Sequence, residues 1–565
     1  MSLFSSLQIA NNALIAQQLG LQVVGNNIAN ANTPGYVRED LTLMPAPTSK
    51  EGGVLIGMGV DVEGIRQKTD KFLDERLRGA NADLANSQSQ DDTFVQLQSL
   101  LGQLSDTDLN AGLTKFFSSI QDVLNQPESL SVRNVAIQQA TTLTTDIRNL
   151  DSRVRDMQGK LDSNIANSAN DINRLTSLIA NLNVKIATFE GGNAIPSDAV
   201  GLRDQRTQAL NDLAKLINVK TYEQPSGAVA VYAGGDYLVA DGQSRAVTAA
   251  FDPDSNQGNA ELRIVDTNSK LEIDSGEVAG EINSRDQVLG TFLGKLNNLT
   301  KTLTFEFNKI YSGGQGLSGY NDLTSEFNVN SADTPLDAAG LPFTPVNGSF
   351  QLQVHNKQTN TTSTTNINVQ LNGLDDDTTL NSLVASLNTV DGISAKVTTD
   401  KKLEITSNSQ NIEFAFGNDT SGVLASLGVN TFFSGSTAGD IGVNQTLASD
   451  PSKLAISSGG IGADTQNGLL LATFSDRPLD TQNGQSLSNL YDNFIGDTAQ
   501  AGATVRASLN GAKAYQMTLN SQQLSISGVS IDEETVKMLS YQRAYQASAR
   551  FVKTLSDLLD TLVNL

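Results

Sequence analysis

The first 28 residues place hydrophobic side chains at alternating steps of four and three. Such steps align side chains on one stripe of an α-helix and are typical of a coiled-coil seam. The C-terminal end shows a similar pattern, and Ser530 and Glu533 form an S-x-x-E capping box that predicts a helix start near residue 530. We therefore expect an amphipathic helix at each end of the chain. The N-terminal stripe consists of Leu3, Leu7, Ala10, Leu14, Gln17, Leu21, Val24 and Ile28, and the C-terminal stripe of Tyr541, Tyr545, Phe551, Val552, Leu555, Leu558, Leu559 and Leu562.

A third stripe predicts a long helix between Pro127 and Pro196. Its apolar residues follow alternating steps of four and three from Leu143. An extra step of four precedes Ile165, after which the alternating steps continue to Phe189. An extra step of this kind is a stutter, which locally relaxes a supercoil. Further helices are predicted at 70–124, 200–217, 282–311 and 485–525, which together form a helical bundle built from both halves of the sequence.

Alternating patterns predict β-structure in two insertions. The first insertion holds hairpins at 228–240, around Gly234-Gly235, and at 261–273. The second follows the Gly-rich stretch 312–319. It is predicted to be an α+β domain with strands at 349–355, 366–371, 393–398, 402–407 and 411–416 and short helices at 378–388 and 420–427.

The predicted fold class is therefore α+β and multidomain. Terminal coiled-coil helices and a long helical bundle are built from both chain ends, and β-rich domains are inserted between them. The expected domains are a terminal helical domain (1–50 with 526–565), disordered in the monomer; a helical bundle (51–220 with 277–320 and 446–525); a β-hairpin insertion (221–276); and a variable α+β outer domain (321–445).

The amino-acid composition of the chain excludes several common kinds of catalytic and metal site. The 565 residues include no cysteine and one histidine, which excludes disulfides, thiolate nucleophiles and Cys/His zinc sites. A formal charge of -23 disfavours nucleic-acid binding. The sequence has no run of 18 apolar residues, so we expect no membrane-spanning helix. No cleavable export signal is visible before the first charged residue, Arg38.

Three remaining candidates are better explained as structural. Asp252-x-Asp254-x-Asn256 resembles a calcium loop, but Arg263 stands where a bidentate Glu should be, so we favour a solvated turn. The cluster 375–377 fits helix capping better than paired catalytic carboxylates, and His355 lies in an alternating strand pattern. We expect no catalytic residue, cofactor or metal.

The terminal stripes are the candidate functional surface. The first 37 residues contain no charged side chain, and Asn, Gln and Ser on the polar face can be buried without desolvating a charge. We therefore favour packing between copies of the chain over an intramolecular core. The expected interface residues are Leu3, Leu7, Leu14, Leu21, Val24, Ile28, Tyr36, Tyr541, Tyr545, Phe551, Val552, Leu555, Leu559 and Leu562.

Four stretches resemble a known family. NNIANANTPGY at 26–36 and GVSIDEETVKMLSYQRAYQASARFVKTLSDLLDTLVNL from Gly528 resemble the terminal signatures of bacterial flagellar rod, hook and hook-associated axial proteins. IGMGVDVEGIRQKTDKFLDERLRGA from Ile56 and LRDQRTQALNDLAKLINV from Leu202 are similar to the hook-associated protein 1 family of the hook–filament junction. The resemblance covers about three quarters of the chain and leaves out 320–445.

The resemblance implies a nested architecture and a structural function. The chain would form an adaptor ring with its own copies between the flexible hook and the filament, contacting the hook protein and the second junction hook-associated protein. It would be exported unfolded by the flagellar type III system, with a cytoplasmic chaperone on the C-terminal helix. The alternatives are another axial subunit, of hook or filament, or a secreted glycan-binding or peptidoglycan-acting protein with its site in 321–445.

Overall fold

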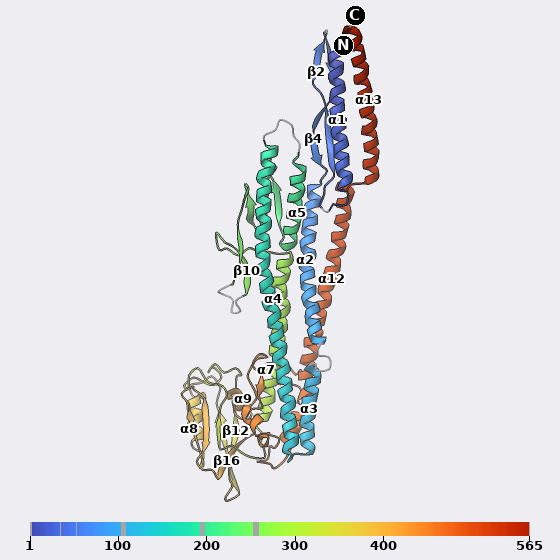
Figure 1. Cartoon of the computed structure of the whole chain (residues 1–565). Helices are drawn as coiled ribbons and strands as arrows, with labels where there is room; N and C mark the ends of the chain where they lie inside the picture. The colour runs from blue at the N-terminus through green and yellow to red at the C-terminus, as the bar shows by residue number, and fades with distance from the viewer. Residues whose placement is uncertain are drawn as a thin grey trace. The chain divides into compact units, whose positions relative to one another are not determined.

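The computed structural model describes residues 3–33, 35–51, 53–102, 109–191, 198–251 and 259–563, which fall into two compact units (Figure 1). Unit 1 comprises Met1–Thr93, Gly159–Gln287 and Ala503–Leu565, and unit 2 comprises Phe94–Gln158 and Val288–Gly502. Three long helices contribute residues to both units: α2 (Lys71–Gly102), α4 (Leu130–Glu190) and α12 (Leu487–Ser527). The four-domain division expected from the sequence stays a prediction.

The two ends of the chain lie together in unit 1. Helix α1 (Leu3–Ala29) packs along α13 (Ile531–Val563), and these two helices form the terminal hairpin (Figure 1). Strands β1 (Glu39–Pro45) and β4 (Val60–Gln67) pair antiparallel beside α1 and carry a smaller hairpin of β2 (Thr48–Glu51) and β3 (Val54–Gly57). We did not predict these four strands. Most of their residues are at least partly exposed, and a bulge at Thr42/Leu43 breaks the alternation, which weakens the period-two signal.

The rest of unit 1 packs sheets against helices. Helix α5 (Val200–Leu216), α6 (Glu277–Asn283) and the second half of α4 bury apolar side chains against the strands. The four-stranded sheet runs β5 (Lys220–Glu223), β6 (Val229–Ala233), β7 (Asp236–Ala240), β8 (Gln243–Ser244). Gly234 and Gly235 form the predicted turn, with φ of +56° and +93°. The hairpin predicted at 261–273 is only partly correct: β10 (Ala260–Ile264) pairs chiefly with β9 (Val247–Phe251).

Helix α4 shows the effect of the stutter directly. Leu143, Ile147, Leu150 and Val154 are buried, whereas Met157 and Leu161, which lie just before the extra step, are half-buried. From Ile165 to Ile186 the stripe is buried again, and only its last member, Phe189, is exposed. The apolar stripe therefore turns partly outward at the stutter and then returns to the core.

Unit 2 combines a helical core with a β-rich part. Helices α3 (Leu109–Asn125), α7 (Gly290–Ser312), which follows a π-helical turn (Ser284–Leu289), and α11 (Gln466–Ala472) lie in this unit. Short elements complete it: α10 (Gln445–Ser449), β17 (Phe433–Ser434) and β18 (Gly442–Val443). Aromatic rings meet in its centre, with centroids 5.0–6.3 Å apart for several pairs among Phe116, Phe117, Phe307, Phe432, Phe433 and Phe474.

The predicted strands of the outer α+β part are all present. One sheet runs β13 (Thr361–Val369), β12 (Gly348–Asn356), β16 (Ile412–Gly417), and the other runs β11 (Asp322–Thr324), β15 (Leu403–Ser407), β14 (Ile393–Val397). Helices α8 (Leu380–Leu387) and α9 (Val423–Leu427) stand where short helices were expected and bury Leu side chains in the same core. The alternating patterns were clear here because one face of each sheet is buried.

Of the three candidate functional sites considered in the sequence, two have structural roles and one lies outside the described residues. The expectation that the cluster 375–377 caps α8 is wrong, because Thr379 is the N-cap, in a capping box with Ser382. Asp377 instead accepts hydrogen bonds from the backbone N–H groups of Asn372 and Gly373, at 2.7 and 2.9 Å. The Nδ1 atom of His355 lies 3.0 Å from the Thr362 hydroxyl across the β12–β13 pair. The run Asp252-x-Asp254-x-Asn256 lies outside the described residues.

Candidate functional site

Several residues of α1 are buried, and one of them, Gly20, lies where α1 meets α13. Ala10, Ala16, Gly20 and Val24 of α1 are buried. A methyl group on Gly20 would lie 2.7 Å from the ring of Tyr541, so the aromatic ring occupies the space that a side chain would need. The absence of a side chain at position 20 thus lets the two helices approach closely at this level.

The expected interface residues divide into inner and outer positions. Val24 and Leu555 are buried, Tyr545 and Phe551 are exposed, and the side chain of Leu562 lies outside what the structure describes. The remaining members are half-buried: Leu3, Leu7, Leu14, Leu21, Ile28, Tyr36, Tyr541, Val552 and Leu559. Tyr541 packs against Gly20 within the chain, so part of the predicted surface already has an intramolecular partner.

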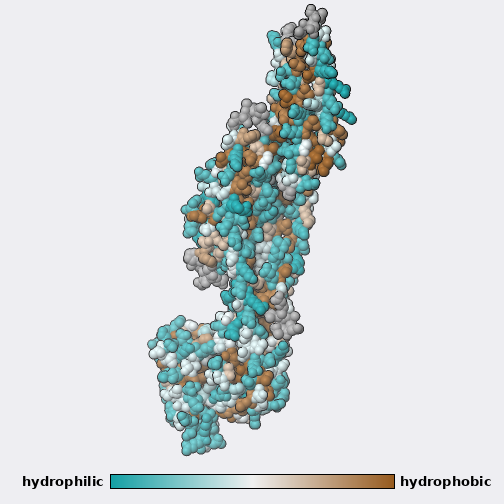
Figure 2. Space-filling view, viewed as in Figure 1, coloured by the Kyte–Doolittle hydropathy of each residue, from teal (hydrophilic) through white to brown (hydrophobic). Residues whose placement is uncertain are grey.

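A second stripe on α1 faces outward and carries no charge. Phe4 and Ile15 are 73% and 47% exposed, and exposed amide side chains follow the same four-three spacing. On α13, exposed apolar side chains alternate with charged ones. Figure 2 shows hydrophobic side chains gathered along the terminal hairpin. The members of the stripe on α1 are Phe4, Gln8, Asn11, Ile15, Gln18 and Gln22, and the exposed apolar residues of α13 include Ile531, Val536, Leu539, Tyr545, Phe551 and Leu558.

A buried asparagine joins the two ends of the chain. The Asn27 side chain is fully buried; its Nδ2 donates to the backbone carbonyl of Glu39 (2.9 Å) and to Glu534 Oε2 (3.0 Å). Its Oδ1 accepts from the Glu39 N–H (3.0 Å) and from the Tyr36 hydroxyl (2.8 Å). One amide therefore links the end of α1, the following loop, the start of β1 and the first turn of α13.

Arg38 adds an ionic link at the same place. Its guanidinium pairs with Glu533 (3.1 Å) and with the buried carboxylate of Glu534 (2.7 Å), and its backbone N–H donates to the carbonyl of Ser527. The predicted capping box is half formed: the Ser530 hydroxyl accepts from the Glu533 N–H at 3.4 Å, while the Glu533 side chain binds Arg38. We call Asn27, Tyr36, Arg38, Glu39 and Glu534 the polar knot.

Acidic groups crowd the polar knot. Burial raises the pKa of Glu39, partly offset by the hydrogen bond from Asn26. Burial, and then the charge of Glu39, raise the pKa of Asp204 on α5 to about 7. Burial raises the pKa of the Tyr36 hydroxyl, and the charges of Glu39, Asp204 and Glu534 act in the same direction. Tyr36 therefore stays a neutral hydrogen-bond donor to Asn27 at physiological pH.

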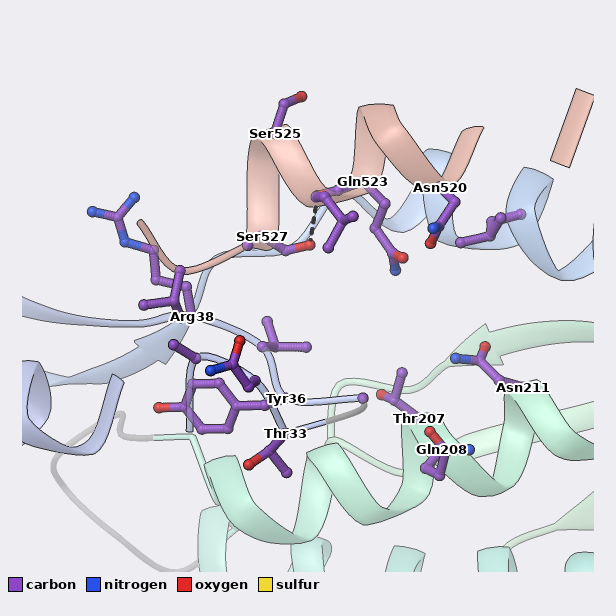
Figure 3. A pocket seen from close by; sticks show the side chains of 18 of the residues that line it. Thr33, Tyr36, Arg38, Thr207, Gln208, Asn211, Asn520, Gln523, Ser525 and Ser527 are labelled. Atoms are coloured by element: carbon purple, nitrogen blue, oxygen red, sulfur yellow. Dashed lines mark hydrogen bonds between the residues drawn. The ribbon is translucent and has the colours of Figure 1, made fainter. Parts of the chain in front are cut away.

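A cleft of 660 Å³ opens beside the polar knot. Figure 3 shows Thr207 and Asn211 of α5 facing Asn520 and Gln523 of α12, with Tyr36 at one end. Gly35, in the loop after α1, has φ of +79°, and a methyl group there would lie 2.6 Å from Gln208 Oε1. The positive φ favours glycine here, whereas the flexible Gln208 side chain could move aside.

The chemistry of this cleft suits recognition of protein backbone. Amide and hydroxyl groups dominate its lining, and they can donate to and accept from peptide groups. Among the residues that the structure describes, no group of three or more His, Cys, Asp or Glu side chains is arranged to hold a metal ion. None of the described helices is long and apolar enough to cross a membrane.

Sequence reasoning missed most of the polar knot. Tyr36 was predicted, but Asn27, Arg38, Glu39 and Glu534 were not, because the search followed apolar stripes. One signal was available: Arg38 and Glu39 are the first two charged residues, after 37 uncharged positions, and both are buried. Buried charges need partners, and the acidic first turn of α13 offers carboxylates that can pair with Arg38.

The whole chain is similar to flagellar proteins. A family model described as "Flagellar hook-associated protein FlgK helical domain" matches residues 94–327. "Flagella basal body rod protein" matches 7–36, and "Flagellar basal body rod FlgEFG protein C-terminal" matches 520–565, so these two models cover most of α1, the loop after it and α13.

Curated relatives match along their full length. The chain is 26% identical to "Flagellar hook-associated protein 1" of Salmonella typhimurium, over 99% of this chain and 100% of the relative. It is 24% identical to the proteins of the same name from Escherichia coli, over 99% and 100%, and Bacillus subtilis, over 100% and 98%. The fold is similar to that of the flagellar hook junction protein FlgK from Burkholderia pseudomallei, with a TM-score of 0.50, 15% identity, and coverage of 80% of this chain and 100% of that chain.

Proposed function

We propose that this chain, a member of the flagellar hook-associated protein 1 family, is a structural subunit of the bacterial flagellum that joins the hook to the filament at the hook–filament junction. The observation that carries this proposal is the uncharged outward stripe of α1 beside the exposed apolar side chains of α13. A neighbouring copy can cover these side chains without desolvating a charge on α1. The relatives named hook-associated protein 1 support the location.

The energetic argument concerns the outer positions of the terminal hairpin. Burial of a large apolar side chain contributes about 1.5–3 kcal/mol. Phe4, Ile15, Phe551 and Leu558 are each between 46% and 73% exposed, so most of this free energy is gained only when another molecule covers them. We propose that copies of the chain do so in a ring, through Tyr545 and Phe551 as well as the stripe on α1.

The finer partners follow from the same surface. As a flagellar axial protein the chain assembles with other flagellar components. We propose that these are the hook protein on one side and the second junction hook-associated protein on the other. A cytoplasmic chaperone would cover the apolar side chains of α13 before unfolded export through the flagellar type III channel. We propose no reaction for the chain.

Substitution of an outer residue tests the proposal without disturbing the fold. Ile15→Asp, expressed in cells that lack the chromosomal copy, should yield hooks without filaments and flagellin shed into the medium, because assembly would bury an unpaired carboxylate. Leu21→Asp and Leu555→Asp, which the sequence also suggests, are less clear tests, because Leu555 is only 5% exposed and its replacement would also disturb the hairpin itself.

A matched control separates assembly from general damage. Leu374 is 66% exposed in the outer α+β part, so Leu374→Asp should leave motility and filament number unchanged. The Ile15→Asp chain should keep the circular dichroism spectrum of the parent. Normal filaments on cells with this variant would contradict the proposed packing, and activity of the isolated chain on peptidoglycan would favour the glycan-acting alternative.

A further inference from the structure

Arg78, on α2 within unit 1, is a buried cation that lacks a counter-ion. The residue is 8% exposed, and one Nη donates to the Thr221 hydroxyl at 3.1 Å. Its Nε has no hydrogen-bond partner, and among the described residues no carboxylate pairs with Arg78 within 4.0 Å. A guanidinium in such surroundings forfeits hydration without the compensation that buried charges usually have.

The cavity beside Arg78 has room for a small ligand. Its volume is 320 Å³, and its walls come from the end of β4, the first turns of α2, helix α5 and strand β5. A water molecule in liquid occupies about 30 Å³, so the space holds a small polyatomic ion together with several waters. The cavity is therefore large enough for an oxyanion at Arg78.

Every other cation that lines the cavity is already engaged. Lys71 pairs with Glu223, and Arg203 pairs with Glu190 (2.7 Å) and Glu223 (2.6 Å). Arg206 donates to Asn183 Oδ1 (3.0 Å) and to the carbonyl of Gly227 (2.6 Å). Among the described residues, Arg78 alone of these four cations has no carboxylate within 4.0 Å, since Arg206 also lies 3.9 Å from Glu223.

The nearby acidic residues do not replace a ligand. Asp74 accepts a hydrogen bond from Gln523 Nε2 at 2.8 Å, and Glu75 is exposed. Burial lowers the pKa of Arg78, and the charges of Asp74 and Glu75 only partly oppose this change. An anion in contact with the guanidinium would act in the same direction as these carboxylates, but at closer range.

We propose that the Arg78 cavity binds a small oxyanion, either a carboxylate or a phosphate-like ion, which pairs with the guanidinium group of Arg78. The planar guanidinium suits such groups, which commonly accept two parallel hydrogen bonds from arginine. Two sources offer this chemistry: a dissolved ion, or an acidic side chain of a neighbouring copy. The second source rests on the proposed assembly, whereas the site itself does not.

Thermal unfolding of the full-length chain tests the site. Sodium phosphate and sodium acetate are titrated to 50 mM at pH 7, with NaCl adjusted to hold the ionic strength constant. A ligand that binds only the folded state raises Tm, by about 1–2 °C once its concentration reaches roughly ten times Kd. Arg78→Gln should abolish this rise, whereas Arg78→Lys should keep a reduced one.

Arg76 supplies a matched control on the same helix. It is exposed, stacks on the rings of Phe72 and Tyr515, and lies outside the cavity lining. Arg76→Gln should therefore respond to phosphate as the parent does. No rise in the parent with either ion, or an equal rise in Arg78→Gln, would overturn the proposal, the second result indicating adventitious binding.

The assembled form distinguishes the two sources. If the ligand is a neighbour's carboxylate, 50 mM phosphate should slow polymerisation of the parent chain severalfold relative to NaCl, and Arg78→Gln should polymerise slowly in either salt. If the ligand is a dissolved ion, polymerisation of the parent should not change. Failure of assembly in all conditions would count against the proposed function, while the Tm response of the isolated chain would still report on the site.

Discussion

The isosteric substitution Asn27→Asp should open the terminal hairpin. It keeps the Oδ1 acceptor for the Glu39 N–H and the Tyr36 hydroxyl. It replaces the Nδ2 donor with an oxygen that lies against the Glu39 carbonyl and against Glu534 Oε2, which are 2.9 and 3.0 Å from Nδ2 in the parent. The shape is preserved while an attractive contact between two chain ends becomes repulsive.

The expected cost has two parts. Loss of the hydrogen bond to the Glu39 carbonyl costs about 1 kcal/mol. The variant can avoid charge repulsion if its new carboxyl group takes up a proton. Keeping that group protonated at pH 7 costs about 4 kcal/mol, because the ordinary pKa of aspartic acid is about 3.9. Together these terms correspond to opening of the contact that is several thousandfold more frequent at pH 7. Near pH 4 only the first part should remain.

Hydrogen–deuterium exchange of the full-length chain measures this opening locally. Backbone amides in α1 and in the first turns of α13 should lose protection at pH 7, and most of that loss should disappear at pH 4 after correction for the intrinsic exchange rate. Asn11→Asp is the control, since Asn11 is exposed on the same helix and its replacement should change protection by less than about tenfold. Unchanged protection in Asn27→Asp at pH 7 would refute the assigned role of the polar knot.

Two further predictions concern neighbouring contacts. Gly20→Ala places a methyl group 2.7 Å from the Tyr541 ring, so overpacking should outweigh the helix propensity of alanine and destabilise the hairpin by about 1 kcal/mol. In a Tyr541→Ala background the same substitution should stabilise the hairpin. If hydrogen exchange shows that Gly20→Ala destabilises the hairpin in both backgrounds, the close contact is excluded. The pKa of Asp204 is raised to about 7, so its burial opposes folding increasingly as pH rises from about 4 to 7. Asp204→Asn should therefore be more stable than the parent above pH 7 and similar below pH 4, and parallel pH profiles of Tm for the two proteins would contradict this.

The sequence predicted elements best where one face is strongly buried. The 61-residue helix α4, its stutter at Ile165 and the strands of the outer α+β part all carry a clear period, because each buries a continuous apolar face. Strands β1 to β4 show a weaker pattern, since most of their residues are at least partly exposed and a bulge at Thr42/Leu43 shifts the pairing of β1 with β4. The spacing of apolar residues also could not separate the inner from the outer positions of the terminal helices. Leu555 and Phe551 belong to one predicted surface, yet Leu555 is buried and Phe551 is exposed.

The polar knot could not be predicted from local pattern because its partners are remote in sequence. Asn27 looked like one more amide on an uncharged helix, and its four hydrogen bonds depend on a loop geometry that needs Gly35 with positive φ. Glu534 looked like a favourable charge in the first turn of a helix. Only the fold shows that the two residues contact each other.

The contact between Asn27 and Glu534 joins positions 507 residues apart. Synthesis must pass residue 534 before this contact can exist, so a polypeptide cut short upstream of that residue leaves the buried amide without its partner on α13. The fold thereby carries its own check for completeness: a prematurely terminated molecule would be marked by a loose first helix, which proteases can recognise and remove before it is built into a larger structure.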